Sequence, residues 1–430
     1  MKALYTAAVA LLLSVTTSAQ INDDLSSQQG NDSYITIEKC YQKARSYYPL
    51  SKKYNLIALS EKYSLANAST AYIPQLSISA GATYQSEVIT LPIDIPGFDS
   101  PKIDKDQYSS SLEIAQLIWD GGATNSRKQN IRAQSEVARK EFEVDMYALH
   151  ERINNIYFGI LLLDEQIKQL DIMIDEIRDM YNKVENCINN GVANNSDLDM
   201  VEVEIVTANQ NRIKLESFKK AYLDMLSLLV GEKITSSSRL IKPAIPKISN
   251  NNNRPELALF EAKIKELESG KGFINAKNLP SIGLFVRGSY GKPGFNPFNN
   301  ELTTYAIGGV KFSWNIGTLF TRKNEIRTIE IGKKNVDIAA EAFLFNNNLA
   351  ATQQLAEIEK YQKIMCDDDK IIILRERIRK AAKAELENGT ISTSDYIREL
   401  SKEEIAKQEK ILHEIELLKS FYQLKTTLNN

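Results

Sequence analysis

Large apolar residues recur along residues 123–190 at alternating steps of four and three, the a/d spacing of a coiled-coil heptad. No proline lies between Pro101 and Pro243, so nothing in this stretch breaks a helix. We therefore expect one helix of roughly 67 residues, about 100 Å long at 1.5 Å per residue, that packs against other helices. The apolar series is Phe142, Met146, Leu149, Ile153, Ile156, Ile160, Leu163, Ile167, Leu170, Ile174, Ile177, Tyr181, Val184 and Ile188.

Two other stretches alternate with a period of two, which is typical of strands with two different faces. Residues 76–85 and 281–290 predict the first strand of each pair, and residues 108–119 and 305–314 predict the returning strands. The expected apolar face includes Leu76, Ile78, Leu284 and Val286.

These strands are about ten residues long and end in aromatic residues, as do the strands of transmembrane β-barrels with aromatic girdles. A soluble sheet with one solvated face would give the same alternation. The export signal described below and the long helices favour the barrel. The expected membrane-interface aromatics are Trp119, Trp314, Tyr84, Tyr290 and Tyr305.

The chain is a tandem duplication. The pattern W-x-x-G-x-x-x-[ST]-R-K-x-x-I-R begins at Trp119 and returns at Trp314, and Asn190-Gly191 returns as Asn388-Gly389. The offset between the copies changes along the chain. It places 11 extra residues between Pro74 and Trp119 in the first copy and three extra residues in the long helix of the second.

Each copy predicts the same order of elements: a helix, a β-hairpin and a long helical hairpin. The first helix is expected at residues 36–71 and again at 254–277. We divide the chain into a signal peptide at 1–19, a first repeat at 20–231, a linker at 232–253 and a second repeat at 254–430. The β-hairpins span 75–119 and 281–314, and the helical hairpins span 123–230 and 318–427.

Sharp turns connect the paired helices. The pairs Asn190-Gly191 and Asn388-Gly389 fit a left-handed helix C-cap, where glycine carries no Cβ penalty. Ser196 and Ser394 are expected to cap the helices that follow. Asp197, Asp199 and Asp395 are expected in the positive first turn of those helices.

The first 20 residues combine Lys2, an apolar run and small residues before Ala19, which predicts a secretory signal cleaved after Ala19. The net charge is −2, which argues against nucleic acid as a partner. The cysteines Cys40, Cys187 and Cys366 lie far apart in predicted helices, so we expect buried or half-buried single thiols rather than disulfides. With two histidines and no catalytic or phosphate-binding motif, we expect no enzyme activity, metal site or cofactor.

Four strands cannot close a barrel, and lipid does not tolerate an open sheet edge because every backbone group there must be paired. A membrane-embedded form of this protein must therefore oligomerise, and each chain contributes four strands. A barrel closed in this way is compatible with more than one number of chains.

The chain resembles the TolC-like outer-membrane efflux proteins in the order and duplication of its features. These features are the signal peptide, the strand pairs that lead through a W-[DN]-x-G turn into very long helices, and the Asn-Gly turns. The resemblance covers the whole mature chain. It implies a mainly α fold in which a homotrimer forms one β-barrel in outer-membrane lipid, with four β-strands from each chain joined to long antiparallel coiled-coil helices. It also implies a helical tunnel into the periplasm that docks on a periplasmic adaptor and an inner-membrane transporter of the RND or ABC type.

The same resemblance implies roles for the turns. Asn190, Gly191 and Val192, with Asn388, Gly389 and Thr390, match the adaptor-docking tips. Asp395 matches an acidic ring at the pore constriction, where Asp197 and Asp199 are further candidates. The family's second acidic position in this ring is Arg398 here, a departure from a doubly acidic ring. An interpretation of Asp197 and Asp395 as residues that only stabilise a helix dipole fits the sequence equally well.

Three functions are compatible with these features. The first is an exit duct of a tripartite efflux pump, the second is the outer-membrane channel of a type I protein secretion system, and the third is a secreted coiled-coil scaffold without a pore. The alternating strands favour a duct, because a scaffold needs no lipid-facing band. The choice between the two ducts lies with the transporter, so the sequence does not decide it.

Overall fold

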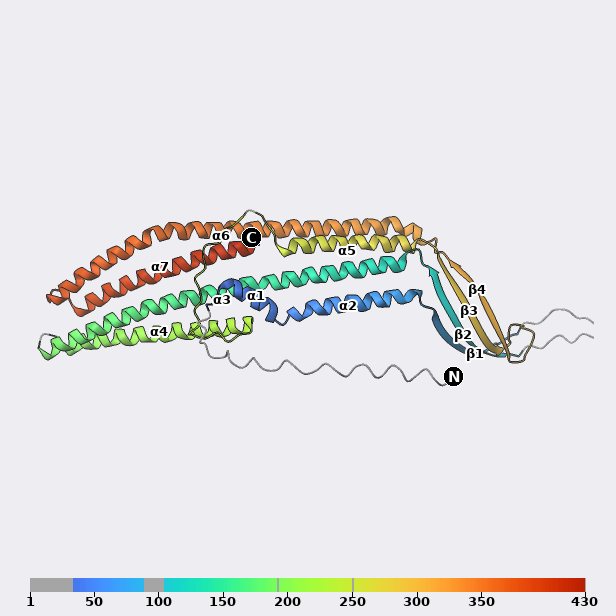
Figure 1. Ribbon diagram of the computed structural model, residues 1–430, viewed down its shortest axis with the longest axis horizontal. Coiled ribbons are helices and arrows are strands. Elements are labelled where there is room, and N and C mark those ends of the chain that lie inside the picture. Colours follow the sequence, from blue (N-terminus) through green and yellow to red (C-terminus); the bar gives the residue numbers. More distant parts are fainter. Residues whose placement is uncertain (1–33, 89–103, 192, 250, 430) are drawn as a thin grey trace, which may run out of the picture.

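We analysed a computed structural model that describes residues 34–88, 104–191, 193–249 and 251–429. The expected signal peptide lies outside the described residues, and so do residues 89–103 between the first two predicted strands, where we expect an extracellular loop at about 87–106. The first repeat contains the helices α1 (Ile37–Tyr47), α2 (Ser51–Ser69), α3 (Ala123–Asn189) and α4 (Asn195–Val230) and the strands β1 (Gln75–Tyr84) and β2 (Asp106–Trp119). The second contains α5 (Pro255–Lys277), β3 (Ser281–Lys292), β4 (Thr303–Ser313), α6 (Thr318–Glu387) and α7 (Thr393–Leu428). Figure 1 shows a long body of helices with all four strands at one end.

The heptad series predicted for residues 123–190 is confirmed as one helix of 67 residues. Every member of the series is buried or partly buried, including Ile153, Ile160 and Ile177 at 0% exposure. Around the middle of α3 these residues pack with α1, the end of α4 and the end of α7, and further along they pack with α4, α6 and α7. The apolar stripe of α3 is thus the axis of the core.

The second copy repeats the first with the predicted length difference. Helix α6 has 70 residues against 67 in α3, whereas α4 and α7 have 36 residues each. Both helical hairpins turn at the end of the molecule farthest from the sheet (Figure 1). The three extra residues lie in the outgoing helix alone.

The first helix and the exposure of the cysteines differ from the expectation. The single helix expected at 36–71 is divided into α1 and α2, and Pro49 lies at the break. Proline disfavours a helical conformation in the residue before it and has no N–H to donate. Of the three cysteines, Cys40 is buried in α1, but Cys187 and Cys366 are exposed in the single chain. They occupy surface positions of α3 and α6 rather than the packed stripe.

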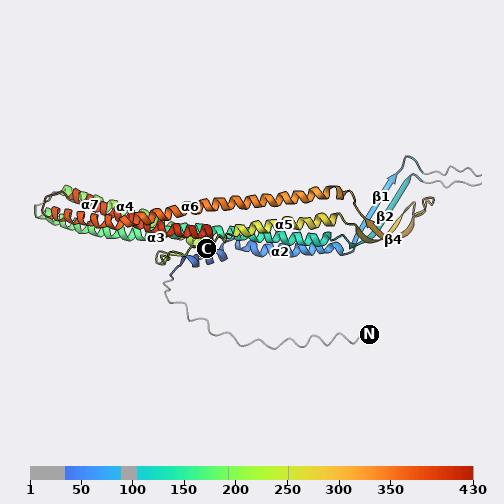
Figure 2. The same ribbon diagram turned by 90° about the horizontal axis from the view of Figure 1, so that it is seen from above.

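The four strands form one antiparallel sheet in the order β1-β2-β3-β4, so β1 and β4 are its edges. The sheet leaves the helices at an incline (Figure 2). Its register unites the two repeats, because β2 pairs with β3 along their lengths from Tyr108–Lys292 to Trp119–Ile282. A bulge between Leu117 and Trp119 lets Trp119 pair with Ile282.

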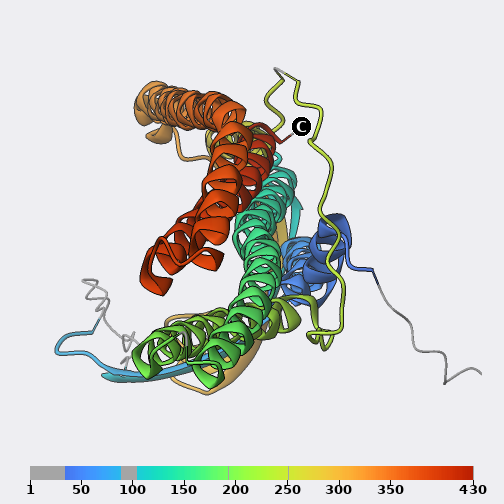
Figure 3. The ribbon, with the colours of Figure 1, turned by 90° about the vertical axis from the view of Figure 1, so that its left-hand side faces the viewer.

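Viewed along the long axis, the helices form an open arc (Figure 3). Helix α3 forms the middle of the arc, with α6 and α7 toward one end and α4 toward the other. The linker and α1 lie on the convex side of this arc. Among the described residues, no helix combines the length and apolarity needed to cross a lipid bilayer.

Candidate functional site

The two tip turns have nearly the same geometry. Gly191 and Gly389 adopt φ values of +74° and +70°, which confirms the predicted left-handed caps. The amide side chains of Asn190 and Asn388 each donate to the carbonyl four residues before, at 2.9 Å. At the second tip the N–H of Thr390 donates to the carbonyl of Glu385 at 2.9 Å, completing a Schellman motif. Val192 lies outside the described residues.

The helices after the tips begin two residues earlier than predicted. Asn194 and Ser392, rather than Ser196 and Ser394, are the N-caps. Each forms a capping box with the aspartate three residues on. Asp197 and Asp395 are therefore in the first turn as expected, whereas Asp199 lies beyond it.

The Asp395 carboxylate belongs to the cap of α7 and also pairs with Arg398. Its Oδ2 accepts hydrogen bonds from the hydroxyl and the N–H of Ser392, at 2.7 and 3.3 Å, and its Oδ1 accepts one from Arg398 at 2.9 Å. The hydrogen bonds from Ser392, with the charge of Arg398, hold the pKa of the Asp395 carboxyl below its usual value. Asp395 is thus ionised at neutral pH and partly balanced within its own chain.

The sheet has two chemically different faces. On one face Leu76, Ile114 and Val286 pair across three strands, and Ile78 beside them is 78% exposed. The other face carries Ser77, Glu113 and Arg287 in one row. The Arg287 Nε donates to the Glu113 Oε2 at 2.6 Å. In the next polar row Ser79 and Ser111 are joined by a hydrogen bond of 2.8 Å.

The predicted aromatics fall at both ends of the sheet. Trp119 and Trp314 lie where strands meet helices, and the Trp314 indole N–H donates to the carbonyl of Asn278 at 3.1 Å. Tyr84 and Tyr290 lie toward the other end, on the apolar face. Tyr305 differs from the expectation, because it pairs with Ser289 and so lies on the polar face.

Sequence reasoning missed a residue that orients the strand–helix junction. The Asp120 carboxylate accepts from the N–H groups of Gly122 at 2.9 Å and Thr124 at 2.7 Å, and from the Tyr72 hydroxyl at 2.9 Å. Although burial raises the Asp120 pKa, the hydrogen bonds from Thr124, Tyr72 and Gly122 together lower it. The signal was present in the repeated W-[DN]-x-G pattern, since aspartate is a preferred capping residue.

The family model described as "outer membrane efflux protein" matches residues 55–232, which contain β1, β2 and the first helical hairpin. This match covers most of the first repeat. No curated protein sequence matches the chain significantly.

The similarity to solved outer-membrane proteins and channels extends over nearly the whole chain at the level of the fold. The outer membrane protein VceC from Vibrio cholerae is 11% identical, with a TM-score of 0.65 over 92% of this chain and 96% of that one. The CmeC outer membrane channel of Campylobacter jejuni is 14% identical, with a TM-score of 0.63 over 97% and 93%. The MtrE outer membrane channel of Neisseria gonorrhoeae, solved in its open state, is 13% identical, with a TM-score of 0.64 over 92% and 89%.

The protein is therefore an efflux-type outer-membrane channel rather than an enzyme, with a TolC-like fold whose helices extend into the periplasm. Within the described ranges, no three histidine, cysteine or carboxylate side chains are grouped as metal ligands would be. The candidate functional regions are therefore surfaces: the apolar face of the sheet, its polar face and the charged helical tips.

Proposed function

We propose that this chain is the exit duct of a tripartite efflux pump, assembled as a homotrimer that passively conducts substrates received from a periplasmic adaptor and an inner-membrane transporter. The observation that carries the proposal is the two-faced sheet with unpaired edges at β1 and β4. In lipid these edges need strand partners, and β4 of one chain can pair with β1 of the next. Three chains of four strands give 12 strands.

The dimensions of the sheet support membrane insertion. From Ile282, opposite Trp119, to Tyr290 there are eight residue steps along β3, or about 27 Å at ~3.4 Å per residue. With the usual tilt of about 40°, this corresponds to about 21 Å of height, close to the apolar band of about 25 Å in such barrels. The polar face, with its Glu113–Arg287 pair, would then line the lumen.

The helices also have unpaired apolar surfaces at opposite edges of the arc. On α6, Ile331, Ile338 and Phe345 follow each other at seven-residue spacing and are 60–71% exposed. On the opposite edge of the same half of the rod (Figure 1), Leu56 and Tyr63 of α2 are also seven residues apart and are 63% and 59% exposed. A second copy that brings its α2 edge against α6 would bury both stripes, as coiled-coil seams require. The arc of one chain thus becomes part of a closed tunnel.

Two measurements test the duct. Light scattering of the detergent-extracted, folded protein should give three chains per particle, and planar bilayers should show discrete conductance steps. A monomer or dimer in detergent, or bilayers that stay silent with folded trimer, would contradict the architecture. Phe345→Glu should dissociate the trimer, because it places three charges in the proposed seams. The matched control Lys363→Glu, at an exposed lysine of the same helix, should not.

We propose that Asp395 and Arg398 form the periplasmic constriction and that the tip turns dock the adaptor. Threefold symmetry would bring three Asp395 carboxylates near one axis, and the Arg398 of each chain offsets their repulsion. Arg398→Ala should therefore loosen the constriction and raise single-channel conductance. Asp395→Ala should weaken block by cations added from the periplasmic side. Wild-type conductance and cation block in both variants would leave Asp395 as a capping residue only.

The pump and the secretion duct differ in what depends on the channel. Deletion of the gene should sensitise cells to small toxic compounds if the channel serves a pump. It should instead abolish export of a particular protein if the channel serves a type I secretion system. Cross-linking from cysteines placed at Gly191 and Gly389 should capture an adaptor in either case. An intact trimer that captures no periplasmic protein would argue against both assemblies.

A further inference from the structure

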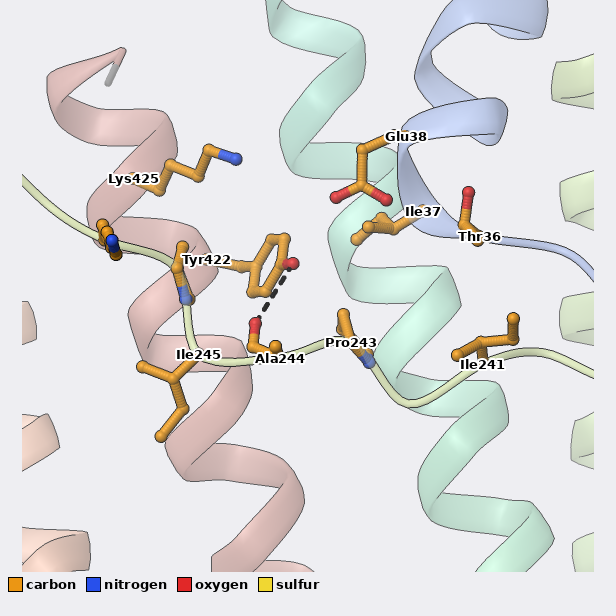
Figure 4. A pocket seen from close by; sticks show the side chains of 11 residues that line it. Thr36, Ile37, Glu38, Ile241, Pro243, Ala244, Ile245, Tyr422 and Lys425 are labelled. Atoms are coloured by element: carbon orange, nitrogen blue, oxygen red, sulfur yellow. Dashed lines mark hydrogen bonds between the residues drawn. The ribbon is translucent and has the colours of Figure 1, made fainter.

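A pocket of about 500 Å³ lies where the linker crosses between the start of α1 and the end of α7. Ile37 of α1, Pro243 and Ile245 of the linker, and Tyr422 of α7 form its walls (Figure 4). The Tyr422 hydroxyl donates to the carbonyl of Ala244 at 3.4 Å and so fastens the linker to α7. The volume is within the range of pockets that bind small ligands.

Two opposite charges meet at this pocket without pairing. Glu38 and Lys425 both project toward the space above Tyr422, one from α1 and the other from α7 (Figure 4). The Lys425 ammonium lies 5.6 Å from the centre of the Tyr422 ring. Glu38 contacts the Tyr422 hydroxyl, and neither charge forms an ion pair within the part of the chain that the structure describes. A ligand that carries both charges could satisfy both groups at once.

The linker offers a third kind of contact. It runs extended through the pocket, and the backbone groups of Ile245 and Lys247 form no backbone hydrogen bond within the described residues. An extended segment with unpaired N–H and C=O groups can pair with another extended backbone, as in β-strand addition. The apolar walls suit small side chains, and the convex position of the linker in Figure 3 opens the site away from the concave side of the arc.

We propose that this pocket binds a short, free, zwitterionic oligopeptide from the periplasm. Its α-ammonium group pairs with Glu38, its α-carboxylate pairs with Lys425, and its backbone lies along the linker. A bound peptide would join α1 of the first repeat to α7 of the second. The inference does not rest on the proposed function, because the site is separate from the duct and from the tips.

Isothermal titration of the full mature protein in detergent with trialanine tests the proposal. We expect saturable binding that weakens at least tenfold in Glu38→Gln and in Lys425→Gln, because each variant removes the charge that pairs with one end of the peptide. N-acetyl-trialanine amide keeps the backbone but lacks both charges, so it should bind at least tenfold more weakly. Lys39→Gln, an exposed lysine of α1 outside the pocket, should bind trialanine as the wild type does.

Circular dichroism establishes that the charge variants remain folded. Absence of saturable binding to the wild type would overturn the proposal. Equal binding of trialanine by the wild type and both charge variants would also overturn it, as would equal binding of the free and the blocked peptide.

Discussion

One arginine bonds to residues of both helical hairpins. Arg379 of α6 donates through Nε to Glu403 of α7 at 2.5 Å, and its Nη1 lies 3.4 Å from Glu176 of α3. Glu403 is 2% exposed, and its other carboxylate oxygen is 2.7 Å from Lys407. Replacing Arg379 by Met keeps most of the apolar stem but leaves one oxygen of a buried carboxylate unpaired.

The expected cost follows from the remaining contacts. Removing one partner of a buried ion pair costs about 3–5 kcal/mol when the other charge is left alone. Because Lys407 still compensates Glu403, we expect about 2–3 kcal/mol, the scale of one lost hydrogen bond to a charged group. Amides of α7 that exchange hydrogen through local opening should then exchange roughly 30- to 150-fold faster, at 1.36 kcal/mol per factor of ten.

The double variant Arg379→Met/Glu403→Met separates charge from packing. It removes the unpaired carboxylate, and replacing both members of a buried pair by apolar groups is often neutral. Exchange in α7 should therefore return close to wild-type rates. Arg178→Met, which removes an exposed arginine of α3, should change exchange little. If the double variant exchanges as fast as Arg379→Met, the loss is one of packing and the electrostatic reasoning is refuted.

Three further predictions concern the sheet, the junction and the core. Ile78→Arg should destabilise the protein in lipid vesicles by about 2–4 kcal/mol near the bilayer midplane, while Ser79→Arg on the polar face should cost little; equal costs would mean that the faces are misassigned. Asp120→Ala should lower the free energy of unfolding by about 1–2 kcal/mol through the lost cap, measured by denaturant titration, whereas Asn125→Ala in the same helix serves as the control. Burial lowers the pKa of His150 from 6.5 to about 4. Stability should thus be complete above about pH 6.5 and fall by about 3 kcal/mol as the pH drops to 4, and a thermal-unfolding series on His150→Phe should lack this part of the decline.

The heptad seam, the duplication and the alternating strands could be predicted because each depends on spacing alone. The α3 stripe and the Gly191 and Gly389 caps are local patterns, and the structure confirms them. The N-caps lie two residues before the predicted ones because each tip offers several residues that can cap a helix, and only backbone geometry selects Asn194 and Ser392.

Other features depend on which surfaces meet. Heptad spacing does not reveal that the α3 stripe is covered within the chain while Ile331 and Ile338 of α6 remain exposed. Pairing of Glu113 with Arg287 requires the β2–β3 register, which joins residues 174 positions apart. The exposure of Cys187 and Cys366 likewise depends on which side of α3 and α6 faces other helices.

The three extra residues of α6 have a consequence for symmetry. Three residues turn a helix by about 300° and lengthen it by about 4.5 Å, so the insertion is not a whole turn. The duplicated hairpins of one chain are therefore related only approximately, and the proposed trimer would have exact threefold symmetry but only pseudo-sixfold symmetry at its periplasmic rim. A partner that contacts every hairpin of that rim must accommodate two different surfaces in alternation, and a partner matched to one of them would bind at three places around the ring.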